Sequence, residues 1–144
     1  MSDDKIKLQL QETITSLLAL RLFILPNPQI EGVNGNINKK ALGYIYGHID
    51  AFLRTRGYDM ADSEMSIPLT FHVLRKLFPD GNATRYMEFL IDNLTDPIVT
   101  LGCMAGGQQY LDYRKPNSGS PMGLARFILE AMASDAPTTE QSKQ

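Results

Sequence analysis

The chain has 144 residues, of which 43% are hydrophobic and 21% are charged, and these proportions are ordinary for one globular domain. Lys and Arg number 14 and Asp and Glu 16, so the net charge of −2 leaves no surplus of positive charge for the phosphates of a nucleic acid. The single cysteine, Cys103, excludes an internal disulfide and a zinc site made of cysteines alone.

No segment has the length expected of a membrane span. The longest apolar stretch covers residues 14–25 and carries Arg21, whereas a spanning helix needs about 20 apolar residues. The mixed charges before this stretch and the Pro26-Asn27-Pro28 sequence after it are not typical of a signal peptide. A lone cysteine also suits a reducing compartment. We therefore expect a cytoplasmic protein that binds neither a membrane nor nucleic acid.

The first predicted element is a helix over residues 4–25. Its leucines and isoleucines recur every three or four positions, which is the spacing of one helix face. Pro26 then ends the helix, because proline cannot donate a backbone hydrogen bond and disfavours a helical residue before it. A polar loop follows, in which residues 29–33 have room for a short extended piece.

Caps, prolines and glycines bound the remaining helices. Asn36 or Asn38 can cap the second helix, which reaches Arg56, and Gly57 supplies a left-handed end after it. Asp96-Pro97 is the clearest helix start, because an Asp cap accepts free backbone N–H groups and proline loses nothing at the first helical position. The same devices predict a third helix over 66–78, opened by Ser66 and Pro68, a fourth over 83–94, a fifth over 97–114 and a sixth over 121–132.

Strand-like alternation is weak throughout the chain, so we predict an all-α fold. It is a compact bundle or an orthogonal array of about six helices, and one domain over residues 1–133 contains them all. The polar residues 134–144, which include Pro137, cannot bury apolar surface. We expect them to form a disordered tail.

Glycines inside two of the helices are the unusual feature of the sequence. Gly43 and Gly47 lie opposite the apolar face of the second helix, and Gly102 and Gly106 have the same spacing in the fifth. Each glycine costs a helix about 0.5–1 kcal/mol relative to alanine, so another backbone or a ligand is expected to approach closely there. Three interpretations remain open: the two helices pack closely within one chain, the glycines form a contact between subunits, or they floor a binding groove.

The end of the first helix is apolar on more than one side. Eight of the nine residues from 17 to 25 are apolar, which is more than a core-facing stripe requires. Such a helix is either wrapped by its own fold or shared with a partner, and homo-oligomers with two-fold symmetry are the commonest outcome. The candidate contact residues are Leu17, Leu20, Phe23 and Ile24 on this helix, together with Gly43, Gly47, Gly102 and Gly106.

Polar and aromatic side chains that follow the glycines of the fifth helix form the candidate ligand site. Their donors and acceptors can line a groove floored by Gly102 and Gly106 and closed by side chains from the second helix. The alternative is structural, with tyrosine rings packed inward, glutamines in solvent and a hydrogen-bonded histidine at the border of the core. The candidate ligand-binding residues are Tyr44, His48, Gln108, Gln109, Tyr110 and Tyr113.

No pattern in the sequence supplies a cofactor, a metal or a catalytic group. Cys103, His48 and His72 are zinc-ligand types, but no HxxxH, HExxH or CxxC spacing brings them together. Cys103 stands in an apolar, glycine-rich helix, which suits an inert thiol better than a nucleophile. The acidic connector over 59–64 lacks the ligand order of an EF-hand, and no glycine-rich phosphate loop is present.

Two functions from different classes therefore remain. The first is a small helical protein–protein interaction, adaptor or regulatory protein that forms a homodimer or binds another protein and has no catalytic activity. The second is a helical domain that binds a small molecule, or an enzyme, with a pocket near residues 102–113. The absence of a catalytic constellation favours the first.

Overall fold

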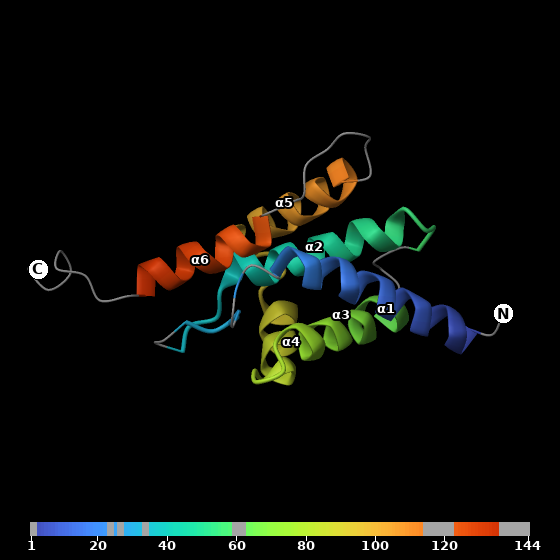
Figure 1. The fold of residues 1–144 in the computed structure, drawn as a ribbon, viewed down its shortest axis with the longest axis horizontal. Helices are drawn as coiled ribbons and strands as arrows, with labels where there is room; N and C mark the ends of the chain where they lie inside the picture. Colours follow the sequence, from blue (N-terminus) through green and yellow to red (C-terminus); the bar gives the residue numbers. More distant parts are fainter. Residues whose placement is uncertain are drawn as a thin grey trace, which may run out of the picture.

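The helix at the centre of the molecule is α2 (Lys39–Arg54), and each of the other helices packs against it (Figure 1). The computed structural model describes residues 3–22, 25, 28–32, 35–58, 63–113 and 123–135. These residues form the predicted all-α helical bundle, and within them the only β-type pairing is one bridge between Glu31 and Ile37. The other helices are α1 (Asp3–Leu22), α3 (Ser63–Leu77), α4 (Ala83–Asp92), α5 (Pro97–Tyr113) and α6 (Gly123–Asp135).

α2 is covered by other elements on nearly all sides, and 11 of its 16 residues are buried. The side that carries Ile45, Ile49 and Phe52 packs into the apolar core. The opposite side, which carries the glycines, is covered by α5. Apolar burial stabilises by about 25 cal/mol per Å², so a helix covered on both sides contributes more than a surface helix of equal length.

α1 lies across α3 and turns one row of apolar side chains inward. Leu10, Ile14, Leu18 and Leu22 are buried, and they recur every four positions, as one helix face requires. The helix is described as far as Leu22, and Leu25, the predicted last residue, is not helical. The predicted stop at Pro26 lies outside the described residues.

Capping residues that the sequence predicts do begin three of the helices. Asn38 accepts a hydrogen bond from a first-turn amide of α2 at 3.1 Å, and Asn82 caps α4 in the same way. Asp96 accepts from the Ile98 amide at 2.8 Å, and its other carboxylate oxygen accepts from Lys39 Nζ at 2.8 Å. The Lys39 hydrogen bond, with help from the Ile98 amide, lowers the pKa of Asp96 below its ordinary value.

The predicted start of α3 is wrong. Ser66 and Pro68 indicated a helix that begins at residue 66, but α3 begins at Ser63 and Pro68 lies inside it. Ser66 is buried, and its carbonyl accepts a hydrogen bond from Thr70 Oγ1 at 2.8 Å. Pro68 is the sixth residue of α3. The backbone hydrogen bond that proline cannot donate therefore lies near the start of the helix, where its loss disrupts the helix least. Burial of this face therefore overrides the local boundary signal.

Candidate functional site

The glycines of α2 and α5 face each other within one chain, which is the first of the three interpretations stated above. A Cβ atom at Gly47 would lie 2.6 Å from the carbonyl carbon of Cys103, and one at Gly106 would lie 2.8 Å from that of Tyr44. The contact is reciprocal, since glycines of each helix lie over carbonyl groups of the other. The remaining two glycines behave in the same way, with Gly43 over the carbonyl of Val99 and Gly102 over that of Lys40.

The two helices run in the same direction, because Gly43 lies over Val99 and Gly47 over Cys103, so the paired positions rise together. Side chains normally hold helix axes about 8–10 Å apart, and these glycines remove them. The backbones then touch, and each Cα–H···O contact of this kind is worth about 0.5–1 kcal/mol. Backbone contact therefore fixes the position of α5 on α2.

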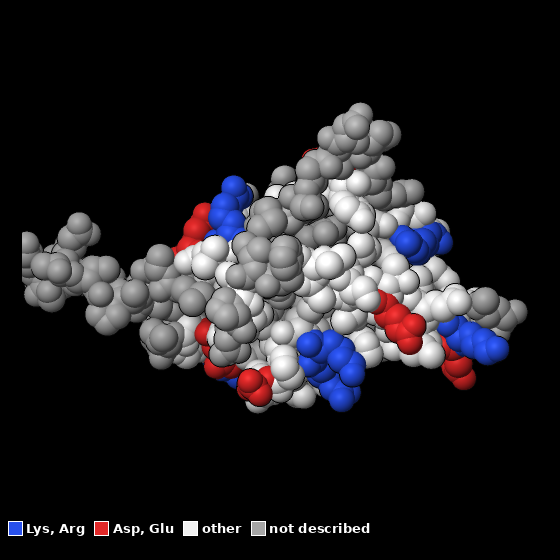
Figure 2. Space-filling view, viewed as in Figure 1, with Lys and Arg blue, Asp and Glu red and all other residues white. Residues whose placement is uncertain are grey.

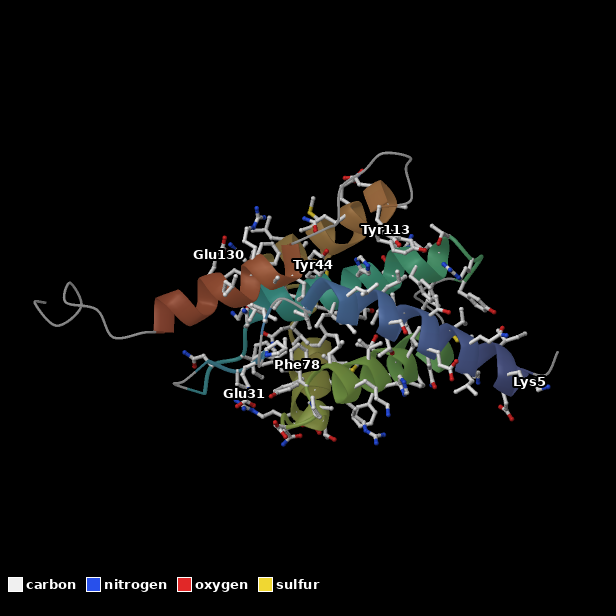
Figure 3. All side chains as sticks on the ribbon, in the orientation of Figure 1. Lys5, Glu31, Tyr44, Phe78, Tyr113 and Glu130 are labelled. Atoms are coloured by element: carbon white, nitrogen blue, oxygen red, sulfur yellow. The ribbon has the colours of Figure 1, made fainter. Side chains whose placement is uncertain are left out.

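One flank of this contact is a buried polar and aromatic cluster where α2, α5 and α6 meet (Figure 3). The Tyr44 hydroxyl donates to Gln109 Oε1 at 2.7 Å, and the Gly123 amide donates to the same oxygen at 3.1 Å. His48 is buried and stacks on Tyr44, with ring centroids 5.5 Å apart. Its Nδ1 donates to the Gly106 carbonyl at 3.0 Å, which assigns the proton to Nδ1.

The same cluster continues to Tyr110 near the end of α5. The Tyr110 ring lies edge-on to His48 and Phe52, and its hydroxyl accepts a hydrogen bond from Arg56 at 2.8 Å. The Arg56 guanidinium also lies 3.9 Å from the centre of the Phe52 ring. Because Tyr44, His48 and Tyr110 are almost fully buried, this flank is closed by the protein's own side chains.

The opposite flank is an open groove of about 480 Å³. Gly47, Ala51 and Gly107 form a floor of small residues, and Met104 and Leu111 of α5 stand along one side. None of the six predicted ligand-binding residues lines this groove. The open groove beside the α2–α5 contact therefore lies on the side of the helix pair away from the polar cluster.

Cys103 also lines the groove, and its chemistry is that of an inert thiol. Burial, and to a smaller extent the charge of Asp50, raises the pKa of Cys103 to about 11. A thiol with this pKa stays protonated at neutral pH and is a poor nucleophile. Asp50 itself accepts from Arg54 Nε at 2.7 Å, so this pair adds no net charge to the rim.

The side of α5 that points away from α2 is apolar and exposed. Leu101 is 57% exposed, Met104 66% and Leu111 42%. At 100° per residue these three side chains fall within an arc of about 80° that is centred opposite Gly106. No other described helix packs on this arc, because α5 packs on α2 and meets α6 only to a small extent. We call Leu101, Met104, Gln108 and Leu111 the outer face of α5.

The predicted ligand-binding residues are divided between separate places. Tyr44, His48, Gln109 and Tyr110 belong to the closed cluster. Gln108 lies on the outer face, where its Nε2 donates to Asp112 at 3.0 Å. Tyr113 is exposed at the end of α5, well along the helix pair from Tyr44 (Figure 3).

The predicted contact residues are also divided. Leu17 is partly buried and Leu20 is 60% exposed, while Phe23 and Ile24 lie outside the described residues. The four glycines are buried between α2 and α5. The sequence shows that the fifth helix is apolar and glycine-rich, but it does not single out Leu101, Met104 and Leu111. A helical wheel whose buried side is set by the glycines identifies them.

Charged and metal-binding groups are dispersed. Among the described residues, no three His, Cys, Asp or Glu side chains come together in a metal-binding group. None of the described helices combines the length and apolarity needed to cross a membrane. On the face drawn in Figure 2, charged side chains of both signs are scattered without a patch of one sign.

The chain matches no protein-family model, and neither a curated protein nor a solved structure shows significant similarity to it. Function is therefore inferred from the residues and contacts given above.

Proposed function

We propose that the protein is a helical interaction protein whose docking surface is the outer face of α5. Single exposed leucines are common on protein surfaces, whereas three large apolar side chains on one arc of one helix form a patch. Such patches favour contact with another protein, and an elongated apolar arc on a helix suits a partner helix. The exposure of Leu101, Met104 and Leu111 is the observation that carries this proposal.

The glycine contact supports the same role. Gly47 and Gly106 place the backbone of α5 directly on that of α2, so α5 has little freedom to shift or turn. A surface that is already ordered before binding loses less entropy when a partner arrives. The glycines thus hold the docking surface in place from the opposite side of α5, but they are not part of that surface.

We propose a non-catalytic role in the cytoplasm. The Tyr44 hydroxyl is hydrogen-bonded to Gln109, and His48 Nδ1 donates to a backbone carbonyl, as structural groups do. The raised pKa of Cys103 argues against a nucleophile. A single unpaired cysteine is also what a reducing compartment allows.

A second candidate function is binding of a small apolar molecule in the groove. Ligand pockets commonly occupy about 300–1,000 Å³, and the groove measures about 480 Å³. Gly107→Leu places a side chain on the groove floor, so this candidate predicts that a hydrophobic fluorescent dye bound by the natural chain is not bound by the variant. Equal dye fluorescence with both proteins would remove the groove as a ligand site.

Photo-crosslinking tests the proposed function. A photoreactive amino acid that replaces Met104 should, on irradiation in the producing cells, form a covalent adduct with a second polypeptide. The matched control places the same amino acid at Leu20, a similarly exposed apolar position on α1, and should give far less adduct. A lack of adducts from position 104 overturns the proposal, and adducts from position 20 alone move the docking surface to α1.

A further inference from the structure

The outer face of α5 has the residue spacing of a coiled-coil seam. Its side chains stand at positions 101, 104, 108 and 111, and the exposed Pro97 precedes them on the same side, so the five positions are alternately four and three residues apart. An average spacing of 3.5 residues is the period of helices that pack side by side with knobs in holes. In this register Leu101 and Gln108 occupy one kind of seam position, and Pro97, Met104 and Leu111 occupy the other.

We propose that a second copy of the chain occupies this seam, with its α5 antiparallel to the first around a two-fold axis at position 106. This inference rests on the proposed function and names the partner. In an antiparallel seam the two kinds of position face each other, so Leu101 meets Leu111 of the second copy and Met104 meets Gln108 of the second copy. Both pairs are centred on position 106, which makes the seam its own complement under two-fold symmetry.

Charge favours both this partner and this direction. Asp112 is the only charged residue between Pro97 and Tyr113. Two copies of this seam therefore do not repel each other along their length. A partner helix with charged side chains would find almost no ion-pair partners on the seam. In the antiparallel register Asp112 lies opposite Thr100 of the second copy, and the two carboxylates stand about 18 Å apart along the axis. A parallel pair would hold both carboxylates at one level and align the helix dipoles.

The residues beside the seam permit close approach. Thr100, Ala105 and Gly107 flank its middle and are too small to hold a second helix away, while Ile98 and Asp112 flank its two ends. The groove adjoins the seam, since Met104 and Leu111 belong to both, so the second α5 extends over its edge. Leu101 to Leu111 spans about 15 Å, which is a small contact, so we expect a reversible dimer whose fraction rises with protein concentration.

Disulfide trapping tests the partner and the direction together. In a Cys103→Ala background, one preparation carries Leu101→Cys and a second, affinity-tagged preparation carries Leu111→Cys. After mixing and mild oxidation, we expect about 10-fold more mixed disulfide dimer than dimer of either variant with itself, because only unlike positions bring their Cβ atoms within disulfide reach. Leu129→Cys, exposed on α6, is the control partner for Leu101→Cys and should not cross-link.

Two outcomes overturn the inference. Efficient cross-linking of Leu101→Cys to itself contradicts the antiparallel register, because a parallel seam brings identical positions together. A complete lack of cross-links, with a monomeric mass for the natural chain at about 500 μM, contradicts pairing of two copies through this face. The two proposals can fail separately: if position 104 photo-crosslinks only to a different protein, the outer face is a docking surface but a second copy is not its occupant, whereas a lack of any adduct overturns the docking surface itself.

Discussion

Gly47 lies directly over the carbonyl group of Cys103, and a methyl group at Gly47 would lie 2.6 Å from that carbonyl carbon. The carbonyl belongs to a helix backbone and cannot move aside unless α5 moves with it. We predict that Gly47→Ala lowers the free energy of unfolding by about 1–3 kcal/mol, because the two helices must separate. Urea denaturation followed by circular dichroism measures this change.

Gly107→Ala is the matched control for that substitution, because it adds the same methyl group to the same helix pair. A Cβ atom at Gly107 would lie 3.4 Å from the Gly47 carbonyl oxygen and 3.9 Å from the Ala51 Cβ atom, which are tolerable contacts. Alanine is the better helix former, so we expect stability to hold or rise by up to about 1 kcal/mol. Equal effects of the two substitutions would contradict the close-approach explanation.

Tyr44→Phe tests whether the polar cluster is structural. The substitution keeps the ring on His48 and removes the hydroxyl that donates to Gln109 at 2.7 Å. We expect a loss of about 0.5–1.5 kcal/mol in the free energy of unfolding, as for other buried hydrogen bonds. Unchanged stability in urea denaturation would show that this hydrogen bond does not help to hold α2 against α5.

Asp96 should make the stability of the fold depend on pH. Its pKa in the folded chain lies below the ordinary 3.8, chiefly because Lys39 donates to the carboxylate. The contribution to stability is therefore complete above pH 3.8 and is lost as the pH falls through the lower folded pKa. Asp96→Asn keeps a capping oxygen and removes the charge. The difference in urea midpoint between the two proteins should be larger at about pH 5 than at about pH 2.5, and a constant difference contradicts the assignment.

Cys103 should react slowly with thiol reagents. Burial raises its pKa from 9.0 to about 11, which lowers the thiolate fraction at pH 8 by about 100-fold. Labelling with iodoacetamide at pH 8 should therefore be at least about 100-fold slower in the native protein than in urea. Similar rates in the two conditions would show that the thiol is neither buried nor perturbed.

Much of the helix pattern can be predicted because capping chemistry is local. Asn38, Asn82 and Asp96 each accept a backbone hydrogen bond within the first turn that follows, so a short window of sequence contains the whole signal. The start of α3 could not be predicted in this way. α3 begins three residues before Ser66, and the burial of Ser66 inside the fold is not visible in a short window of sequence.

The candidate site could be predicted only in part. The spacing of Gly43 and Gly47 indicates that something approaches α2 closely, but a single sequence does not say that α5 is the neighbour. The outer face has the same difficulty. Leu101 and Met104 stand out as exposed only when the side of α5 that packs on α2 is known, and that pairing is a long-range property of the fold.

The solution mass of three proteins tests the central claim most directly: the natural chain, Leu101→Glu on the outer face of α5, and Leu20→Glu on α1. Leu101 and Leu20 are 57% and 60% exposed, so both charges are added at similar cost to the fold, and circular dichroism checks that each variant is folded. Light scattering after size exclusion should give twice the 16.1 kDa of one chain for the natural protein and for Leu20→Glu, but a single chain for Leu101→Glu. A natural chain that is monomeric at about 500 μM, or a dimer that Leu20→Glu breaks and Leu101→Glu does not, would contradict the account.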